Sequence, residues 1–513
     1  MMLFLILRLL SLKINLVLFM TIMKTVVKAK QFQRFFKQFS DVISSPATNM
    51  IIRTRLTDFS RSRTMTFDKV LFYLIFRNRK CAEADLVKFF SQLDILHLKI
   101  SKQALHMNLR KVNINVFRYL FMEFAKLFYS SDLELKYREK YTLLAEDGTF
   151  LQIPYLFSNI EYFGFQKSYH VKEELDVNLV QCKSSGLYDV TNGFFVDFLT
   201  RPVNYSELPL AYNHIERCHE LFQGKNVIYL ADRYYGSAEL ISTLEAHGYK
   251  YCIRGKSNFY KKQIAAMKTN DEEIEVLVDE KWLNRFNHSY TGKEYREKNP
   301  VMKIRVVKFA YTYYDRSNHH PVNCELVYFT NLPKEEFSSA DIVKLYSMRW
   351  DIEVAYKVLK SDLEIERHIS RNRNVAQSAM YGKVIFFNLM GILRKAINRH
   401  LEENPTIKYE TDKDGNEIEV VRTYVVNIHQ LINCVTENGI MENMFNKTKR
   451  KLAEKIDQIA EACIKMKVPI RPDRHNERWG RVVPSGYYYR FSLDGRNFPK
   501  LKTVKGVMRT TKP

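Results

Sequence analysis

One short segment constrains the fold more than any other. Val227-Ile-Tyr-Leu-Ala231 is apolar at every position and runs directly into Asp232. A strand that is apolar on both faces must be covered on both faces of its sheet. Helices are predicted on either side of it, over 206–222 and 238–247, followed by a strand over 249–254. The chain is therefore predicted to be a mixed α/β protein with a central sheet.

Further strands and helices are predicted around this segment from hydrophobic patterning and turn residues. The remaining predicted strands are 141–145, 150–154, 177–182 and 194–199, with a strand-rich stretch at 273–330 and helices from about 339 to 401. The first two strands are expected to pair as a hairpin. The next two are expected to flank a Ser-Gly turn.

The net charge is concentrated at the two ends of the chain. The whole chain has a formal net charge of +23, which indicates a polyanionic partner or a membrane surface. Residues 1–140 contain 25 Lys and Arg against 10 Asp and Glu, and residues 471–513 contain 11 against 3. Basic ends around a nearly neutral centre favour a core domain with arms that bind nucleic acid. Solvated surface charge explains either patch alone equally well.

The N-terminal part is predicted to be helical. Apolar residues recur at helical spacing over 67–77 and 82–93, and Ser101 is typical of an N-cap for a helix that runs through Lys111. This order resembles a helix-turn-helix, with a second helix that reaches phosphates and base edges. The polar side chains on that helix are Lys102, Gln103, Asn108, Arg110 and Lys111. Ordinary packing of two helices explains the same pattern.

The first 23 residues are mostly apolar but are interrupted by Arg8 and Lys13. The uncharged stretches are too short to span a bilayer, and no small-residue cleavage site follows. We interpret residues 1–23 as an extension from an upstream start codon, with Met20 or Met23 as the true start. A membrane anchor is the alternative. The seven cysteines are scattered and form no CxxC pair, which favours a reducing cytoplasm.

Two aspartates follow apolar strands. Asp147 and Asp232 are each expected at a strand end, where neighbouring strands can bring them together. Paired carboxylates repel each other unless they are protonated or bridged by a cation. Mg²⁺ prefers such oxygen ligands, and two metal ions can promote phosphodiester cleavage. Taken singly, each aspartate is explained better as a turn or N-cap residue.

A third carboxylate lies in a predicted helix over 346–360. At 100° per residue, the side chains of Tyr346, Arg349, Glu353 and Lys360 fall within about 60° of one another. The apolar side that this helix would bury contains Val354, Ala355, Tyr356, Val358 and Leu359. A surface stripe with an Arg349–Glu353 ion pair is the alternative, although it explains only half of the stripe.

These residues resemble those of a known family. Tyr346-x2-Arg349-x3-Glu353-x6-Lys360 is similar to the Y-(2)-R-(3)-E-(6)-K signature of the bacterial insertion-sequence family four DDE transposases. The segments 328–333 and 342–346 also look like that family. Asp147-Gly148-Thr149 resembles its first-acid region, and the segment 232–236 resembles its second. The resemblance covers roughly residues 50–400. The stretch 401–470 and the basic tail have no clear counterpart.

The resemblance implies an RNase H-like catalytic core, interrupted by a β insertion before the last acid. Asp147, Asp232 and Glu353 would then form the catalytic triad and bind two Mg²⁺ or Mn²⁺ ions. It implies cut-and-paste transposition through a hairpin at the element's end, followed by joining to target DNA. Tyr346, Arg349 and Lys360 would bind phosphates of the transposon end, and Trp282 would stack on a flipped base. Two ends must be brought together, which implies a homodimer on double-stranded DNA.

The predicted organisation is therefore an α/β catalytic core with an N-terminal helical DNA-binding domain. The boundaries are 1–23 for the extension, 24–140 for the helical domain, 141–400 for the catalytic domain with its insertion at about 261–330, and 401–513 for the C-terminal region. The protein is expected in the bacterial cytoplasm, at the nucleoid when bound to DNA, without a membrane partner. A host RNase H-like nuclease and a catalytically inactive, transposase-derived DNA-binding protein are the alternatives.

Overall fold

The computed structural model describes residues 29–61, 63–77, 81–93, 95, 100–167, 177–256, 259–314, 321–411, 417–446, 449–470 and 490–492. The chain divides into two units. Unit 1 contains residues 1–134 and 374–484, and unit 2 contains residues 135–373 and 485–513. The predicted extension at 1–23 lies outside the described residues, as does the basic tail apart from 490–492.

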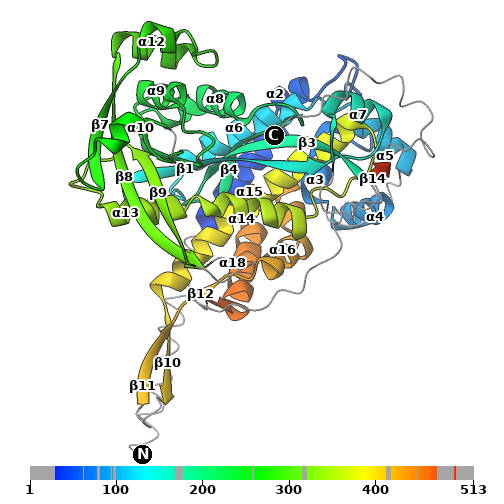
Figure 1. Cartoon of the computed structure of the whole chain (residues 1–513). Coiled ribbons are helices and arrows are strands. Elements are labelled where there is room, and N and C mark those ends of the chain that lie inside the picture. Colours follow the sequence, from blue (N-terminus) through cyan, green and yellow to red (C-terminus); the bar gives the residue numbers. More distant parts are fainter. Residues whose placement is uncertain are drawn as a thin grey trace, which may run out of the picture. The chain divides into compact units, whose positions relative to one another are not determined.

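Unit 2 is built on a central mixed sheet, which confirms the predicted α/β class (Figure 1). Its first strands are β1 (Tyr141–Gln152), β3 (Val177–Asp189), β4 (Phe194–Pro202), β5 (Asn226–Ala231) and β6 (Lys250–Arg254). They lie side by side in the order β4-β3-β1-β5-β6. β3 is antiparallel to β1 and β4, whereas β1, β5 and β6 are parallel. Residues 227–231 of β5 are all buried, as predicted from their apolar character.

Two predicted features of this sheet were wrong. β1 continues through Gln152, so 150–154 is not a hairpin partner of 141–145. The predicted Ser-Gly turn lies inside β3, where Gly186 pairs with Asp147 of β1. The chain reverses later, at Gly193, which has a φ of 76°. The polar residues that resembled turns are accommodated in strands because both backbones satisfy each other's hydrogen bonds along the ladder.

The predicted strand-rich stretch extends the same sheet. β7 (Asp271–Leu277), β8 (Val301–Tyr314) and β9 (Pro321–Thr330) are antiparallel neighbours, and β9 pairs with β6. The short helices of this insertion are α10 (Lys261–Ala265), α11 (Glu280–Leu283) and α12 (Tyr290–Lys298). Two short strands, β2 (Phe165–Lys167) and β14 (Arg490–Ser492), pair with β3.

Helices follow the strands of unit 2 largely where they were predicted. They are α7 (Phe157–Phe163), α8 (Glu207–Cys218) with a 3₁₀ turn at His219–Phe222, α9 (Ala238–Ala246), α13 (Ser339–Ser347) and α14 (Trp350–Ser361). Ser338 begins α13 with a capping box, in which its hydroxyl accepts from Asp341 N–H and the Asp341 carboxylate accepts from Ser338 N–H.

Unit 1 is predominantly helical. Besides a helix over 29–43 it contains α2 (Pro46–Ile51), α3 (Phe67–Phe76), α4 (Ala82–Gln92), α5 (Lys102–Leu109), α6 (Asn115–Tyr129), α15 (Arg373–Glu403), α16 (Ile428–Glu437), α17 (Ile440–Phe445) and α18 (Lys449–Lys465). Its strands are β10 (Thr406–Thr411) with β11 (Glu417–Arg422), and β12 (Tyr424–Val425) with β13 (Val468–Pro469).

The helix α15 packs against the N-terminal helices of unit 1. The Tyr381 ring stacks on Phe117 with centroids 5.6 Å apart, and a Cβ atom on Gly382 would come within 2.4 Å of the Leu74 carbonyl oxygen. Unit 1 therefore includes residues 374–400, which the predicted boundaries assign to the catalytic domain. The sequence pattern did not reveal this grouping because an apolar helix face does not specify which partner covers it.

Candidate active site

The sheet brings two of the predicted acids to one edge. β1 and β5 are parallel, and Glu146 of β1 pairs with Ala231 of β5. The residues that follow this pair, Asp147 and Asp232, therefore lie next to each other across the two strands. Asp147 lies within β1 rather than after it, whereas Asp232 directly follows β5. The Tyr234 N–H donates a 2.7 Å hydrogen bond to Asp232 Oδ1, which orients that carboxylate.

The predicted helix over 346–360 is in fact two helices. α13 ends at Ser347 and α14 begins at Trp350, with Arg349 at the α14 N-cap. The Arg349 N–H donates to Tyr346 O at 3.0 Å, an i to i−3 bond typical of a tighter turn. The prediction of one continuous helix over 346–360 was therefore wrong. The tighter turn nevertheless leaves Arg349 beside both Tyr346 and Glu353.

Arg349 links two of the acids. Its Nη2 lies 2.7 Å from Glu353 Oε1, its Nη1 lies 3.7 Å from Asp147 Oδ2, and its guanidinium carbon is 5.6 Å from the Tyr346 ring centroid. Arg349 and Tyr346 are only 5% and 7% exposed, which excludes the surface-stripe interpretation for them. On the predicted buried side of the helix, Val354 is instead exposed.

Two further contacts hold α14 against β1. The Tyr356 hydroxyl donates to Asp147 O at 2.8 Å, and Lys360 Nζ donates to Thr149 Oγ1 at 2.7 Å. Burial lowers the pKa of Lys360. Tyr356 was predicted only on the apolar side of the helix, although its hydroxyl group could have indicated a second role. Both contacts set the register between the strand of Asp147 and the helix of Glu353.

The three acids are electrostatically coupled. Burial raises the pKa of Asp147 to about 7; the Arg349 charge opposes this shift, whereas Glu353 and Asp232 reinforce it. All three side chains have carboxylate oxygens, which are the ligands that Mg²⁺ and Mn²⁺ prefer. In the part of the chain that the structure describes, no group of three His, Cys, Asp or Glu side chains lies close enough to bind a metal ion. The chemistry of the three carboxylates suits a divalent cation, but in this structure Arg349 lies between Asp147 and Glu353.

A fourth carboxylate, missed by the sequence analysis, borders this site. Glu207, the first residue of α8, packs over Gly148, where an added Cβ would lie 2.6 Å from its Cδ. Glu207 is paired with Lys183 Nζ at 2.9 Å and accepts from the Tyr235 hydroxyl at 3.2 Å. Gly148, which follows Asp147, was the available signal in the sequence, because glycine often marks a place where another group approaches the backbone closely.

A buried polar network lies on the other side of β1. Glu146 accepts a 2.6 Å hydrogen bond from the Ser185 hydroxyl and lies 3.7 Å from His214 Nε2. His214 Nδ1 is 2.8 Å from Asp197 Oδ2, which also accepts from Arg217. Burial raises the pKa of Glu146 to about 8. We interpret this network as a rigid support for β1 directly behind Asp147.

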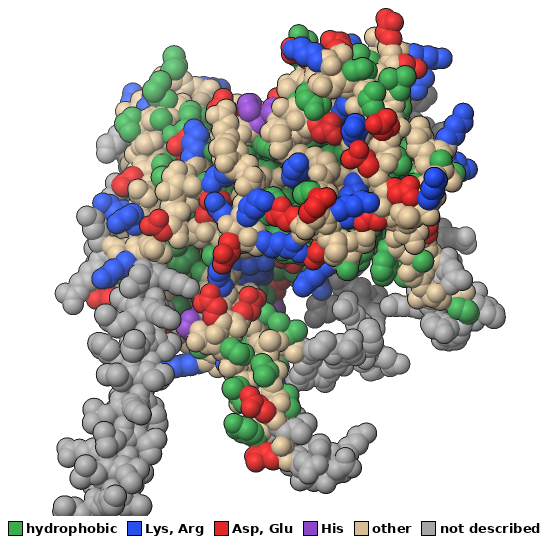
Figure 2. Space-filling view, turned by 90° about the vertical axis from the view of Figure 1, so that its left-hand side faces the viewer, with side chains coloured by type: hydrophobic (Ala, Val, Ile, Leu, Met, Phe, Trp, Pro, Cys, Tyr) green, Lys and Arg blue, Asp and Glu red, His purple; other side chains and the backbone are tan. Residues whose placement is uncertain are grey.

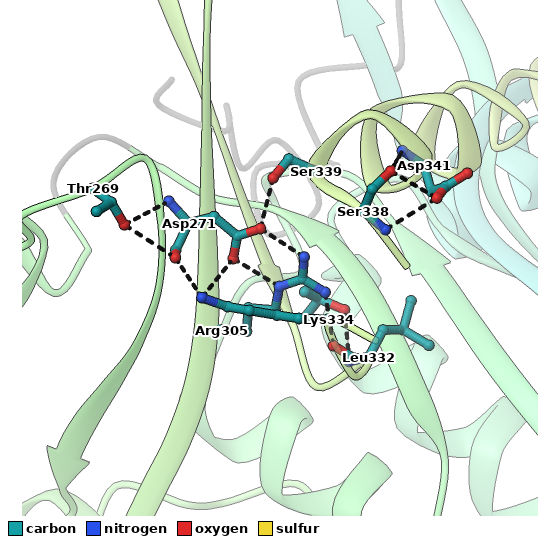
Figure 3. Close-up of polar contacts among 9 residues, drawn as sticks. Thr269, Asp271, Arg305, Leu332, Lys334, Ser338, Ser339 and Asp341 are labelled. Atoms are coloured by element: carbon teal, nitrogen blue, oxygen red, sulfur yellow. Dashed lines mark hydrogen bonds and ion pairs between the residues drawn. The ribbon is translucent and has the colours of Figure 1, made fainter. Parts of the chain in front are cut away.

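Asp271 ties the β insertion to the helix that carries Tyr346 (Figure 3). Its carboxylate accepts from Arg305 Nε at 2.8 Å and Nη2 at 2.6 Å, and from the Ser339 hydroxyl at 2.6 Å. Arg305 Nη1 also donates to Leu332 O at 3.0 Å. These hydrogen bonds lower the pKa of Asp271 to about 2. The contacts join β7 and β8 to the first turn of α13.

Comparisons with known proteins point in one direction. Residues 138–389 match the family model described as "Transposase DDE domain". The chain is 22% identical over 370 residues to the "Transposase for insertion sequence element IS231E" of Bacillus thuringiensis subsp. finitimus, which covers 64% of this chain and 73% of that protein. The chain is a DNA transposase. The matched range contains Asp147, Asp232 and Glu353.

Among solved structures, the transposase is similar to the piggyBac transposase synaptic complex with hairpin DNA. That similarity has a TM-score of 0.41 and 11% sequence identity, and it covers 82% of this chain and 84% of the other.

The predicted DNA-contacting residues of the transposase lie on α5 and at its end. Ser101 caps α5 as predicted, but the helix ends at Leu109, before Arg110 and Lys111. Residues 93–101 separate α4 from α5, a longer connection than the three- or four-residue turn of a helix-turn-helix. Lys102 pairs with Glu83 at 2.8 Å, and Gln103 is exposed. Their contacts with DNA remain predictions.

Trp282 lies on α11 of the insertion, where its ring centroid is 6.2 Å from that of Tyr260. Its stacking on a DNA base also remains a prediction. On the face of the transposase shown in Figure 2, Lys and Arg side chains are interspersed with Asp and Glu side chains. None of the described helices is long and apolar enough to cross a bilayer.

Proposed function

We propose that this transposase moves an insertion sequence by cut-and-paste transposition, with strand cleavage and strand transfer at terminal inverted repeats. Asp147, Asp232 and Glu353 are the proposed catalytic carboxylates. The observation that carries this proposal is geometric: Asp147 and Asp232 lie at the same end of two adjacent parallel strands, and Arg349 links Asp147 to Glu353. Burial, which raises the pKa of Asp147, adds to the need for a cation if these carboxylates are to ionise together.

The cation in this proposal is Mg²⁺ or Mn²⁺, held by Asp147, Asp232 and Glu353. When bound, it would activate a water or DNA 3′-hydroxyl and stabilise the leaving oxygen of the phosphodiester. The chain's own contribution is to hold the carboxylates in register, through Tyr356 on Asp147 O and Lys360 on Thr149. The order β4-β3-β1-β5-β6 supports an RNase H-like core.

Tyr346, Arg349 and Lys360 are proposed to bind phosphates of the transposon end, as in the insertion-sequence family four transposases. An arginine fork can bind two phosphate oxygens, whereas a lysine provides a point contact. Arg349 is paired with carboxylates in the structure. If a divalent cation were held by these carboxylates, the Arg349 guanidinium would be available to bind the scissile strand.

The wider reaction needs two transposon ends and a target duplex. We propose that the helical region within 24–140 binds the ends, that a homodimer brings them together, and that the reaction takes place at the bacterial nucleoid. The excess of basic over acidic residues in 1–140 supports a DNA-binding role. Trp282 is retained as the proposed base-stacking residue of the insertion.

A cleavage assay tests this function directly. The full chain would be incubated with a linear fragment bearing the element's own terminal repeats, with Mg²⁺ or with EDTA, and the products would be resolved on a gel. We expect metal-dependent nicking at the repeat ends, hairpin ends on the excised element and joined products with target DNA. Metal-dependent cutting without end preference would instead indicate a general nuclease. Binding without cutting would indicate an inactive relative.

A further inference from the structure

Unit 1 contains a basic hollow, which shares Asn108 and Lys111 with the predicted second helix and is otherwise lined by a loop that the sequence patterns did not single out. It has a volume of about 190 Å³ and is lined by residues 57–61, 63 and 65 of the loop between α2 and α3, together with Asn108 and Lys111 at the end of α5. Arg61, Arg63 and Lys111 contribute three positive charges to its lining, against the one negative charge of Asp58.

The cations of this hollow are available to a ligand. Arg61 and Arg63 are exposed, and among the described residues neither has a carboxylate within ion-pairing distance. Lys111 Nζ makes a 2.8 Å hydrogen bond to the neutral Asn108 side chain and lies 5.5 Å from the Phe59 ring centroid. Asp58 is used within the loop, where Oδ2 accepts from the Arg55 N–H at 2.9 Å.

Hydrogen bonds join the start of the loop between α2 and α3 to the residues that follow α5. The Thr54 N–H and hydroxyl both bond to Lys111 O, at 3.1 and 2.9 Å, and the Asn113 N–H donates to Ile52 O at 2.8 Å. Phe59 has a φ of 54°, a left-handed conformation that costs a non-glycine residue roughly 1–2 kcal/mol. The start of the loop is therefore attached to the end of α5.

We propose that this hollow binds a backbone phosphate of duplex DNA, with Arg61 and Arg63 as its principal ligands. A guanidinium fork matches the oxygens of a phosphodiester, and a loop attached in this way binds at a smaller entropic cost than an unattached one. Contacts to phosphates position a protein on DNA without reading its sequence. The inference rests on the proposed function for its ligand, because a DNA transposase must hold a duplex outside its catalytic carboxylates.

The test compares the wild-type full chain with Arg61→Ala/Arg63→Ala and with Lys451→Ala/Lys465→Ala. The control pair removes two exposed lysines from α18 of the same unit. Fluorescence anisotropy in EDTA would give the Kd for repeat-bearing and random duplexes over a range of chloride concentrations. Melting temperatures would show that all three proteins are folded. In a second experiment, the titration would be repeated with inorganic phosphate in place of chloride at the same ionic strength.

Loss of two phosphate contacts should lower the slope of log Kd against log salt by about 2 and weaken binding roughly tenfold or more near physiological salt. Both duplexes should lose affinity equally, and the control pair should change it by less than about twofold. If inorganic phosphate displaces DNA from the wild type only, the hollow also binds the free ion. If phosphate acts no differently from chloride, the contact requires the duplex.

Unchanged Kd and salt slope in the folded Arg61→Ala/Arg63→Ala protein would overturn the inference. A loss confined to the repeat-bearing duplex would also overturn it, because that result means base recognition rather than a backbone contact. Absence of Mg²⁺-dependent cleavage by the wild type would count against the proposed function alone, since binding is measured in EDTA.

Discussion

Arg349 holds Glu353 at 2.7 Å and Asp147 at 3.7 Å with two nitrogens of one guanidinium. A helix residue and a strand residue that would otherwise repel each other thus share one positive charge. Because Arg349 is almost fully buried, this charge is poorly screened by solvent. Its position connects the stability of the site with its proposed chemistry.

The first prediction concerns the proposed catalytic carboxylates. Asp147→Asn, Asp232→Asn and Glu353→Gln should each reduce end cleavage at least about a thousandfold, since each removes a ligand charge worth several kcal/mol in the transition state. Affinity for transposon ends, measured in EDTA, should survive. Asp362→Asn, a carboxylate beyond the end of α14, serves as the matched control. Cleavage retained in any of the three variants would remove that residue from the triad.

The same Asp147→Asn change should stabilise the metal-free protein. The pKa of Asp147 is about 7 in the folded chain, above the ordinary 3.8, so ionising it costs folding free energy. Above pH 7, the free energy of unfolding of the variant should exceed that of the wild type by about 2–4 kcal/mol. This advantage should shrink as the pH falls from 7 and vanish below about 4, where both states are protonated. Thermal melts in EDTA across this range test the trend, and a variant less stable at pH 8 would contradict it.

Arg349→Ala should reduce cleavage and strand transfer by about ten- to a hundredfold, which corresponds to the loss of a charged hydrogen bond of roughly 1.5–3 kcal/mol. Arg349→Lys should recover only part of the rate, because lysine keeps the charge but lacks the fork. Excision rate and melting temperature would be measured together. A normal excision rate in folded Arg349→Ala protein would contradict the proposed phosphate-binding role of Arg349. The site would then be that of a general metal-dependent nuclease.

Lys360→Ala should also impair cleavage, because the variant loses both the proposed phosphate contact and the hydrogen bond to Thr149. Thr149→Val separates these two effects, because it removes the hydroxyl acceptor and leaves the ammonium in place. We expect Lys360→Ala to lose about tenfold or more in rate and Thr149→Val to lose less. Equal losses in both variants would mean that Lys360 acts only by fixing the register of α14 on β1.

Asp271 provides a test of the insertion. Asp271→Asn should destabilise the protein by about 2–4 kcal/mol at neutral pH, since it leaves the buried Arg305 without its partner. The folded pKa of about 2 lies below the ordinary 3.8, so this stabilisation is complete above pH 4 and is lost as the pH falls towards 2. Denaturant titrations of wild type and variant should therefore converge in acid. Lys303→Ala, at an exposed ion pair, is the control.

Local patterns were sufficient for much of unit 2. The apolar run 227–231 predicted a buried strand, and the helices predicted at 206–222 and 238–247 were confirmed as α8 with its 3₁₀ turn and as α9. These predictions succeeded because the pattern of apolar residues within a short segment indicates both a buried strand and a helix. The division into units did not follow in the same way, since α15 is apolar whichever unit covers it.

The sequence by itself determined the identity and order of Asp147, Asp232, Glu353 and the basic residues around Glu353. Only the tertiary structure decided that Arg349 would bridge two acids, that α13 and α14 would separate at Met348, and that Tyr356 would bond to Asp147 O. The reason is physical. Spacing along a chain fixes which side chains share a helix face, whereas the partner across a sheet or between helices depends on long-range packing that no single segment encodes.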